Sequence, residues 1–364
     1  MACWRVALIK MGLMGCGAAV QIFHLPAILQ TPGVMVHWIV EPQVERVSPI
    51  ANRLKVPHYG TNYMDVADVD AVIIATPHFL HFPMAEHFLS QGVHVLCEKP
   101  LALNTSDALS LVNLAARKKC HLAVGVYRRF YPVSAFMKQV ITTDWLGELV
   151  RIDIEEGGSY DWDLQSRFML EKEKAGGGVL VDTGSHTLDR ALWLLDARRV
   201  TIQHYADNCR GGLETDCELD LSIPWHGHDI PLHMELSRTR LLKNSFDIQF
   251  EHGRLSVPAN HPSNAVVVDE RLSSDHDQNF RNSFHVDTAK DFDLPGEGQK
   301  PYFIVQFQHF CEAIIGNGTL MNSGESVLTC IQTIESCYSN REMLSETWAN
   351  MQNVNDRMKI GEII

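Results

Sequence analysis

Short apolar segments alternate with amphipathic segments through the first third of this chain of 364 residues. The apolar segments have the length of strands and stand at residues 9–14, 34–40, 69–75, 93–97 and 121–126. The amphipathic segments have helical character and stand at residues 18–30, 43–54, 83–91 and 105–119. Strands separated by helices are typical of a parallel sheet with helices on both faces. Residues 1–124 are therefore predicted to form a doubly wound α/β domain, with its first helix broken at Pro26.

The rhythm changes in the rest of the chain. Strand-like segments now follow one another, at residues 148–155, 219–223, 232–237, 244–250 and 254–257. Residues 224–228 are typical of a hairpin turn, one strong helix is expected at 184–195, and the polar residues 260–299 are expected to form a long loop. This pattern predicts an α+β domain over residues 125–364 with an open, mostly antiparallel sheet. Its closing helices, at about 303–343, are expected to pack back on the first domain.

Charge and composition narrow the possible partners. The chain has 31 Lys and Arg against 44 Asp and Glu, a net charge of −13. Because nucleic-acid backbones are held by basic surfaces, no nucleic-acid partner is expected. No apolar run approaches the roughly 20 residues that cross a bilayer, and the first residues lack the long apolar core of a signal peptide. No membrane partner is therefore expected. A cytoplasmic location is expected as well, because the cysteines are expected to be reduced thiols.

Two other kinds of site find little support in the sequence. The nine cysteines include no C-x-x-C pair and are expected to be buried, reduced thiols. His226, His228 and His233 flank the hairpin turn, but no carboxylate or thiol stands at a useful spacing, so no metal site is expected. The G-x-S-x-G motif of many serine hydrolases is absent from the sequence.

A glycine pair follows the first strand, in Gly15-Cys16-Gly17-Ala18-Ala19-Val20. This segment matches the dinucleotide-binding pattern G-x-G-x-x-G at its first two positions. Gly15 would permit the tight turn, and Gly17 would let the backbone approach a pyrophosphate at a helix N-terminus. Val20 stands where the third glycine or alanine is expected. An ordinary strand–turn–helix connection is the alternative.

Glu41 ends the second strand, about 20 residues after the glycines. An acid at this position accepts hydrogen bonds from the ribose hydroxyls of NAD and repels the 2′-phosphate of NADP. No Arg or Lys follows until Arg46. NAD is therefore the expected cofactor, with NADP less favoured, unless Glu41 is only a solvated carboxylate at a strand end.

Polar residues also follow the next two strands. Ala75-Thr76-Pro77-His78 ends one of them, with His81 three residues later, and both histidines would face one crevice or begin a helix. Glu98-Lys99-Pro100 ends the next strand, where a proline restricts the turn that carries the lysine. Glu98 is expected to orient or neutralise Lys99; a surface ion pair is the alternative. Ligands of open α/β sheets bind at this edge.

Residues 176–189 combine three glycines with acidic and basic side chains. The glycines are expected to give a flexible entry to the segment. Asp182 and His186 are four residues apart, on one face if the segment is helical. A carboxylate beside an imidazole would orient the ring and raise its basicity, as suits a general base near neutral pH. A helix start with a capping Asp and a packed His is the alternative.

Together these residues resemble the Gfo/Idh/MocA family of glucose–fructose oxidoreductase and inositol 2-dehydrogenase. The resemblance rests on residues 12–17 with 24–27, on 75–77 with His81, on 97–101, on 125–130, and on 177–182 with His186. It implies an N-terminal Rossmann domain, a C-terminal domain with an open sheet, and dimers or tetramers. It also implies Lys99 at the substrate hydroxyl and nicotinamide, with His186 as acid or base and Asp182 close by.

Three positions depart from the family pattern. Val20 replaces a small residue, His78 stands where an asparagine is common, and so does Tyr127. The last two bear on the substrate. Other expected substrate contacts lie in the loop before the glycines, at Tyr160, Asp161, Trp162 and Arg167.

The sequence is thus interpreted as an NAD-dependent oxidoreductase of a sugar, a nucleotide sugar or a cyclitol. Lys99, Asp182 and His186 are the expected catalytic residues. The expected cofactor contacts are Gly15, Gly17, Ala18, Ala19, Glu41, Ala75, Thr76, Pro77, His81, Glu98 and Lys99. An NAD-dependent glycosidase and a non-catalytic, NAD-binding sugar sensor are the alternatives on the same fold. Alternating apolar positions such as Leu219 and Leu221 predict a sheet with one face left for a second copy.

Overall fold

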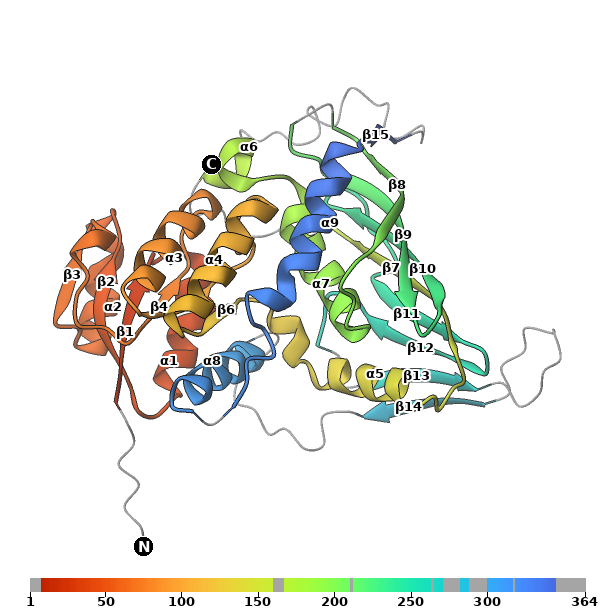
Figure 1. Cartoon of the computed structure of the whole chain (residues 1–364), viewed down its shortest axis with the longest axis horizontal. Coiled ribbons are helices and arrows are strands. Elements are labelled where there is room, and N and C mark those ends of the chain that lie inside the picture. The colour runs from red at the N-terminus through yellow and green to blue at the C-terminus, as the bar shows by residue number, and fades with distance from the viewer. Residues whose placement is uncertain are drawn as a thin grey trace, which may run out of the picture.

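A computed structural model describes residues 8–159, 167–209, 212–262, 265–270, 282–287, 300–316 and 318–344. Two sheets divide the chain into two halves, which Figure 1 shows side by side. Helices α7 (Ser185–Leu194) and α9 (Leu328–Ser339) lie between the two halves (Figure 1). The site described below forms where the ends of both sheets meet.

The first sheet is parallel and has six strands in the order β3-β2-β1-β4-β5-β6. Their bounds are Ile9–Met14 (β1), Val34–Val40 (β2), His58–Gly60 (β3), Ala71–Ile74 (β4), His94–Cys97 (β5) and Leu122–Val124 (β6). All four residues of β4 are completely buried, as the nearly continuous apolar sequence predicts for a central strand. The doubly wound fold is confirmed.

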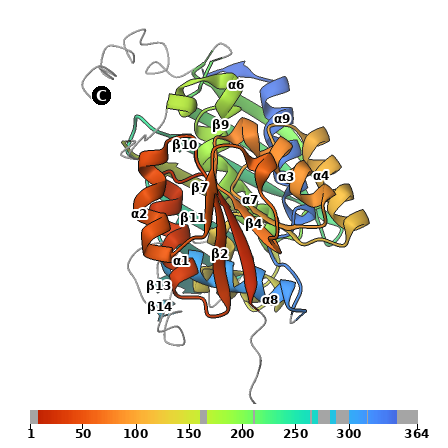
Figure 2. The same cartoon turned by 90° about the vertical axis from the view of Figure 1, so that its left-hand side faces the viewer.

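Helices cover both faces of this sheet (Figure 2). Helices α1 (Leu25–Leu29) and α2 (Val44–Leu54) pack on one face, and α3 (His81–Ser90) and α4 (Thr105–Lys118) on the other. The expected break at Pro26 is wrong, because helical residues run without interruption from Ala18 to Leu29. The residues Val20–His24 form a wide helical turn that leads directly into α1, and Pro26 is the second residue of α1.

The second sheet has nine strands in the order β14-β13-β12-β11-β7-β10-β9-β8-β15. Their bounds are Leu149–Gly157 (β7), Thr201–Asp207 (β8), Asp216–Trp225 (β9), His228–Ser237 (β10), Ser245–Phe250 (β11), Gly253–Pro258 (β12), Ala265–Glu270 (β13), Asn282–Asp287 (β14) and Glu342–Met343 (β15). Only the pairs β7–β10 and β8–β15 are parallel among the pairings described. The mostly antiparallel sheet and the hairpin turn at 226–227 are confirmed.

Three parts of this sheet were not expected from the sequence. Strand β15 stands at residues 342–343, where the end of a closing helix is predicted. The long loop predicted at 260–299 is wrong in part, because β13 and β14 lie within it and extend the sheet. The run Val266-Val267-Val268 favours a strand, but polar residues on both sides hide it. Strand β8 was also missed, since its alternation is only partly apolar.

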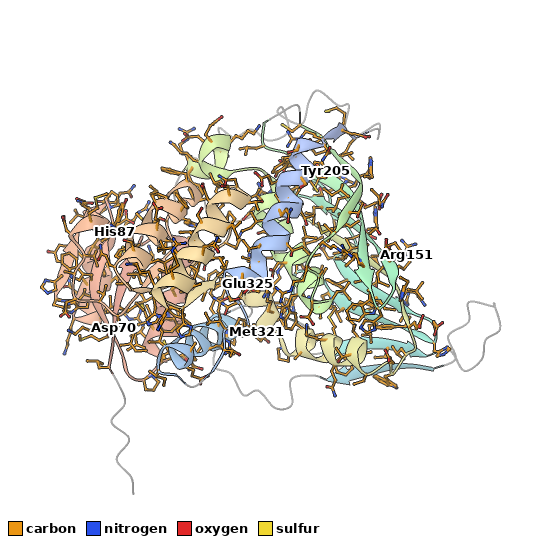
Figure 3. The ribbon with its side chains drawn as sticks, viewed as in Figure 1. Asp70, His87, Arg151, Tyr205, Met321 and Glu325 are labelled. Atoms are coloured by element: carbon orange, nitrogen blue, oxygen red, sulfur yellow. The ribbon has the colours of Figure 1, made fainter. Side chains whose placement is uncertain are left out.

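The second sheet has an apolar face and a polar face. Residues such as Leu219, Leu221 and Ile223 are buried beneath the helices, including α5 (Pro132–Thr142). The alternate residues Glu218, Asp220 and Ser222 point the other way and are partly exposed. Figure 3 shows side chains projecting from the outer side of the sheet, near the labelled Arg151. No described helix of the chain is long and apolar enough to cross a membrane.

The C-terminal segment returns to the first half of the molecule. Helix α8 (Lys300–Ile314) packs on α1, and its residues Ile304 and Phe307 join the core beneath the first sheet. The rings of Phe23 and Phe303 are stacked with their centroids 4.3 Å apart. The two halves are thus joined by packing as well as by the chain.

Candidate active site

A cleft of about 860 Å³ opens where the carboxyl ends of the first sheet face the second half. Every residue expected at the cofactor and every expected catalytic residue lines it. On its far side the lining comes from the ends of β7 and β10, with Ser237 as the last residue of β10 and Arg238 directly after it. This edge of an open α/β sheet is where ligands bind.

The glycine turn has the geometry that a dinucleotide needs. Gly15 has a φ of +95°, and a Cβ added there would lie 2.6 Å from the carbonyl oxygen of Ala75. A Cβ added at Gly17 would meet nothing within 4 Å, so the space beside this backbone is open to the cleft. Val20, which departs from the pattern, is completely buried in the core beneath the sheet. The turn therefore fits a pyrophosphate at the start of the helix.

Glu41 reaches back to this turn. Its carboxylate accepts hydrogen bonds from the backbone N–H of Cys16, at 2.9 Å, and of Gln43, at 3.0 Å. The side chain is buried yet lines the cleft, and each oxygen keeps a lone pair for a further donor. Ribose hydroxyls are donors of this kind, so the site fits an adenosine ribose. Arg46 lines the same end of the cleft.

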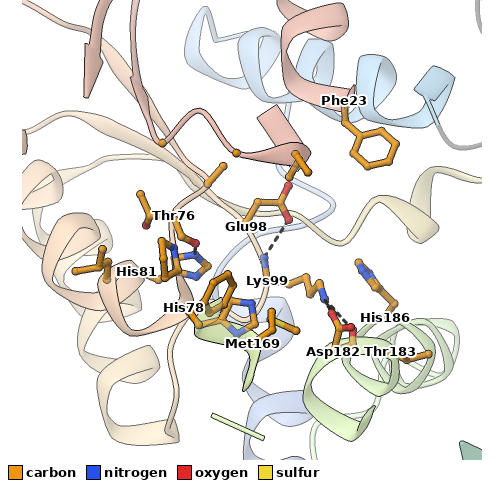
Figure 4. Close-up of a pocket in the computed structure, with 18 of the residues that line it drawn as sticks. Phe23, Thr76, His78, His81, Glu98, Lys99, Met169, Asp182, Thr183 and His186 are labelled. Atoms are coloured by element: carbon orange, nitrogen blue, oxygen red, sulfur yellow. Dashed lines mark hydrogen bonds and ion pairs between the residues drawn. The ribbon is translucent and has the colours of Figure 1, made fainter. Parts of the chain in front are cut away.

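Lys99 and Asp182 meet at the centre of the cleft (Figure 4). The Lys99 Nζ lies 2.7 Å from Asp182 Oδ1 and 2.8 Å from the Asp182 carbonyl oxygen. The other carboxylate oxygen, Oδ2, accepts from Arg238 at 2.5 Å. Burial alone would raise the pKa of Asp182, but the charges of Lys99 and Arg238 hold this pKa far below its ordinary value. Asp182 is therefore an anion that fixes two cations.

Arg238 was missed by the sequence reasoning. It belongs to no motif that the sequence displays, and it reaches Asp182 from a part of the chain 56 residues away. Its place directly after β10 is the only signal that could have found it, because strand ends face the cleft.

The expected pairing of Glu98 with the Lys99 side chain is wrong. Glu98 Oε1 lies 2.7 Å from His24 Nε2, and the only Lys99 group near its other oxygen is the backbone N–H, at 3.3 Å. Burial raises the pKa of Glu98, but the contact with His24, together with the charge and the backbone N–H of Lys99, keeps this pKa below its ordinary value. Glu98 thus anchors the turn to the first helix, and the Lys99 ammonium reaches Asp182 instead.

His186 lies beside Lys99 and Asp182 on the first turn of α7 (Figure 4). Its ring meets the ring of Tyr127 edge to face, with 4.9 Å between centroids, and its Nδ1 has no hydrogen-bond partner among the described residues. Burial first, and then the charges of Lys99 and Arg128, lower the pKa of His186 well below its ordinary value. The charge of Asp182 does raise the pKa of His186, as expected, but it is outweighed by burial and the two cations. The Asp182 carboxylate accepts hydrogen bonds from Lys99 and Arg238. His186 is a neutral imidazole at neutral pH.

His78 and His81 both line the cleft but bond to backbone carbonyls. His78 Nδ1 lies 2.8 Å from the oxygen of Ala175, and burial lowers the pKa of His78 to about 3. The two ring nitrogens of His81 lie 2.7 Å and 2.9 Å from the oxygens of Pro100 and Thr76. His81 therefore ties the ends of β4 and β5 together.

The expected substrate contacts divide into three groups. Tyr127 is buried, lines the cleft and stacks on Phe303 at 4.5 Å. Tyr160, Asp161 and Trp162 lie outside the described residues. Arg167 is exposed and does not line the cleft, because the short turn Arg167–Leu170 presents Phe168 and Met169 to it instead.

The glycines at 176–178 allow neighbouring chain segments to pack closely, and the expected flexible entry is wrong. A Cβ at Gly177 would overlap the hydroxyl of Tyr338, and one at Gly178 would overlap the backbone oxygen of Glu214. Close approach of two other chain segments therefore requires glycine here.

Two of the histidines around the hairpin turn contact other side chains and not a common metal site. His233 Nδ1 lies 2.7 Å from Asp220, and the His226 ring stacks on Trp225. Within the described parts of the chain, no three His, Cys, Asp or Glu residues are placed to hold a metal ion.

Two family models match this chain. Residues 9–126 match an oxidoreductase family described as an NAD-binding Rossmann fold, and residues 135–256 match the GFO/IDH/MocA C-terminal domain. Among similar solved structures, levoglucosan dehydrogenase in complex with NADH and levoglucosan has a TM-score of 0.74 and 19% identity, covering 91% of this chain and 97% of its own. The aldose-aldose oxidoreductase of Caulobacter crescentus has a TM-score of 0.75 and 19% identity, with the same two coverages. These structures share the fold.

Curated relatives match over about half of the chain. The rhizopine catabolism protein MocA of Rhizobium meliloti is 28% identical over 51% of this chain and 56% of its own length. The inositol 2-dehydrogenase of Corynebacterium glutamicum is 28% identical over 54% of this chain and 56% of its own. The chain thus spans less than two thirds of the length of these relatives. Its first half is an NAD-binding Rossmann domain, and the chain belongs to the GFO/IDH/MocA family of oxidoreductases.

Proposed function

We propose that the protein transfers a hydride between NAD and a hydroxyl or keto carbon of a sugar, a nucleotide sugar or a cyclitol. The observation that carries this proposal is the meeting of Lys99, Asp182 and His186 in the cleft that the cofactor turn also lines. The names of the relatives, among them inositol 2-dehydrogenase and 1,5-anhydro-D-fructose reductase, support a polyhydroxylated substrate.

Each side chain has a task in the proposed oxidation. NAD, when bound, supplies the acceptor for the hydride. His186 is neutral and accepts the proton of the substrate hydroxyl. The Lys99 ammonium donates to the same oxygen and stabilises the negative charge that develops there. Asp182 holds Lys99 in place, and Arg238 holds Asp182 from the other side. Reduction reverses the proton transfer.

The test is a panel of cyclitols, hexoses and uronic acids offered with NAD while NADH absorbance is followed. We expect NADH to form with at least one member. An NAD-dependent glycosidase would instead release a free sugar from a glycoside without net NADH, and a sensor would bind ligands without turnover. Either result would replace the proposed function.

Glu41 is proposed to set the preference for NAD. Loss of charge-assisted hydrogen bonds costs about 1.5–3 kcal/mol, so the kcat/KM with NAD should exceed that with NADP at least roughly tenfold. Glu41→Ser should erode this ratio, mainly by improving NADP, because the repulsion of the 2′-phosphate is gone. Steady-state rates with both cofactors measure the ratio. Glu45→Ser, an exposed acid outside the cleft lining, is the matched control and should keep it. Equal use of both cofactors by the wild type would remove Glu41 from this role.

We also propose a homodimer or homotetramer. The support is the second sheet, whose apolar face is buried against helices while alternate residues of β9 on the other face stay partly exposed. A partner copy would meet that face through polar groups, since Glu218 and Asp220 point from it. Light scattering at micromolar protein should give a multiple of the 41.0 kDa chain mass. A mass of one chain would refute the proposal.

A further inference from the structure

The segment that carries Asp182 and His186 is held at its start by the side chain of Glu214, which does not line the cleft. Glu214 is completely buried, and its carboxylate accepts from the backbone N–H of Gly178, at 3.0 Å, and of Leu180, at 3.0 Å. Its backbone oxygen accepts from the N–H of Val179 at 2.9 Å. Three consecutive backbone N–H groups at the start of a helical segment therefore donate hydrogen bonds to a single residue, Glu214.

These N–H groups are the ones that a helix cannot satisfy itself. The first N–H groups of a helix have no partner within it, and an anion at this end also interacts favourably with the helix dipole. Glu214 supplies the missing acceptors and the negative charge, although it lies 36 residues away in the sequence. The glycine at 178 makes the approach possible, since any Cβ there would overlap the Glu214 backbone. Asp182 follows two residues after Leu180.

Tyr338 on helix α9 and Arg341, just after this helix, also contact the Glu214 carboxylate. The Tyr338 hydroxyl donates to Glu214 Oε1 at 2.6 Å, and an Arg341 nitrogen lies 3.8 Å from Oε2. Burial first, and then the charge of Glu214, raise the pKa of Tyr338 well above its ordinary value, so this hydroxyl remains a donor. Arg341 also pairs with the buried Asp207, at 2.7 Å.

We propose that Glu214 is a positioning residue for the reaction proposed above. It fixes the start of the segment 178–186, so that Asp182 meets Lys99 and the His186 ring faces the cleft. Tyr338 holds Glu214 in this orientation and thereby links helix α9 to the site. The inference rests on the proposed function only for its effect on turnover; the anchoring itself is independent of it.

The direct test is Glu214→Gln. The amide keeps the volume of the side chain, but its NH₂ group would face donors and release at least one backbone N–H. Hydrogen–deuterium exchange in peptides covering residues 176–186 should become faster. The kcat should fall about 10- to 100-fold, because misplacement of reacting groups by about 1 Å has effects of this size. The dissociation constant of NADH should stay within about twofold, since the glycine turn and Glu41 lie in the other half.

Asp207→Asn is the matched control. This substitution removes a buried carboxylate that pairs with the same Arg341, and the hydrogen bonds of the Asp207 side chain go to Tyr205 and Cys209, outside the segment 178–186. It should leave both exchange in that segment and kcat within about twofold of the wild type. Equal effects of both substitutions would show general loosening of the domain and overturn the proposal.

Tyr338→Phe keeps the proposal testable if Glu214→Gln does not fold. It removes only one donor, and a smaller fall in kcat, about three- to tenfold, should accompany faster exchange at 176–186. Unchanged exchange in both variants would overturn the anchor, and faster exchange with unchanged kcat would overturn its role in positioning. A wild type without turnover on any panel compound would instead overturn the proposed function, and exchange alone would then decide the anchor.

Discussion

Replacing Lys99 with methionine should lower kcat by a factor of about 10² or more, the range seen when an electrostatic donor is removed from a reacting oxygen. Methionine keeps the length of the stem and removes the ammonium that lies 2.7 Å from Asp182. The affinity for NADH should change little, because the glycine turn and Glu41 remain. Stopped-flow or steady-state kinetics with a panel substrate, with NADH binding by fluorescence, measure both quantities.

Lys10→Met is the control for this substitution. Lys10 lies on β1 of the same domain and pairs with Asp68 at 2.5 Å, outside the cleft lining. Lys10→Met makes the same chemical change away from the cleft and should leave kcat unchanged. Near-normal turnover by Lys99→Met would remove Lys99 from the mechanism.

Substitution of His186 should change the pH dependence as well as the rate. A base must be unprotonated, so oxidation should rise with pH through the pKa of His186 and then level off. The sequence alone predicts this rise in the neutral range. The structure moves it: burial and two nearby cations lower the pKa of His186 well below its ordinary value, so the rise should lie below pH ~6.5, the ordinary pKa of histidine.

His186→Asn should remove this rising limb and lower kcat by about 10² or more, within the range attributed to general acid–base catalysis. Profiles of kcat/KM from pH 4.5 to 9 on both proteins make the comparison. His81→Asn is a useful comparison because His81 lines the same cleft but bonds to two carbonyl oxygens. A wild-type inflection above pH 7, or an unchanged profile in His186→Asn, would place the base elsewhere.

The regular parts of the fold could be predicted because their sequence patterns are local. Strand β4 is apolar at every residue, and the turn after β1 needs glycine at position 15 for its φ of +95°. Such features depend on a few neighbouring residues, and sequence patterns report them well. Strands β13 and β14 were missed because their pairing with the rest of the sheet, rather than their own alternation, makes them strands.

The sequence predicts which residues form the site better than it predicts which of them pair with one another. The sequence brought Lys99, Asp182 and His186 together, but it paired Glu98 with Lys99 and Asp182 with His186. The structure shows different pairs: Glu98 pairs with His24, and Asp182 forms ion pairs with Lys99 and Arg238. Such pairings join segments 56 to 83 residues apart, and no local pattern reports them.

Deuterium labelling of the substrate shows whether hydride passes directly from its carbon to the nicotinamide ring. The panel compound that yields NADH is offered in its carbon-deuterated form, and the NADH is isolated and analysed by mass spectrometry. Direct hydride transfer predicts one deuterium atom in the nicotinamide ring for each molecule of product, and in Lys99→Met the same labelling at a rate lower by a factor of about 10² or more. Product that forms while the NADH pool gains no deuterium would contradict direct hydride transfer in the Lys99–Asp182–His186 cleft.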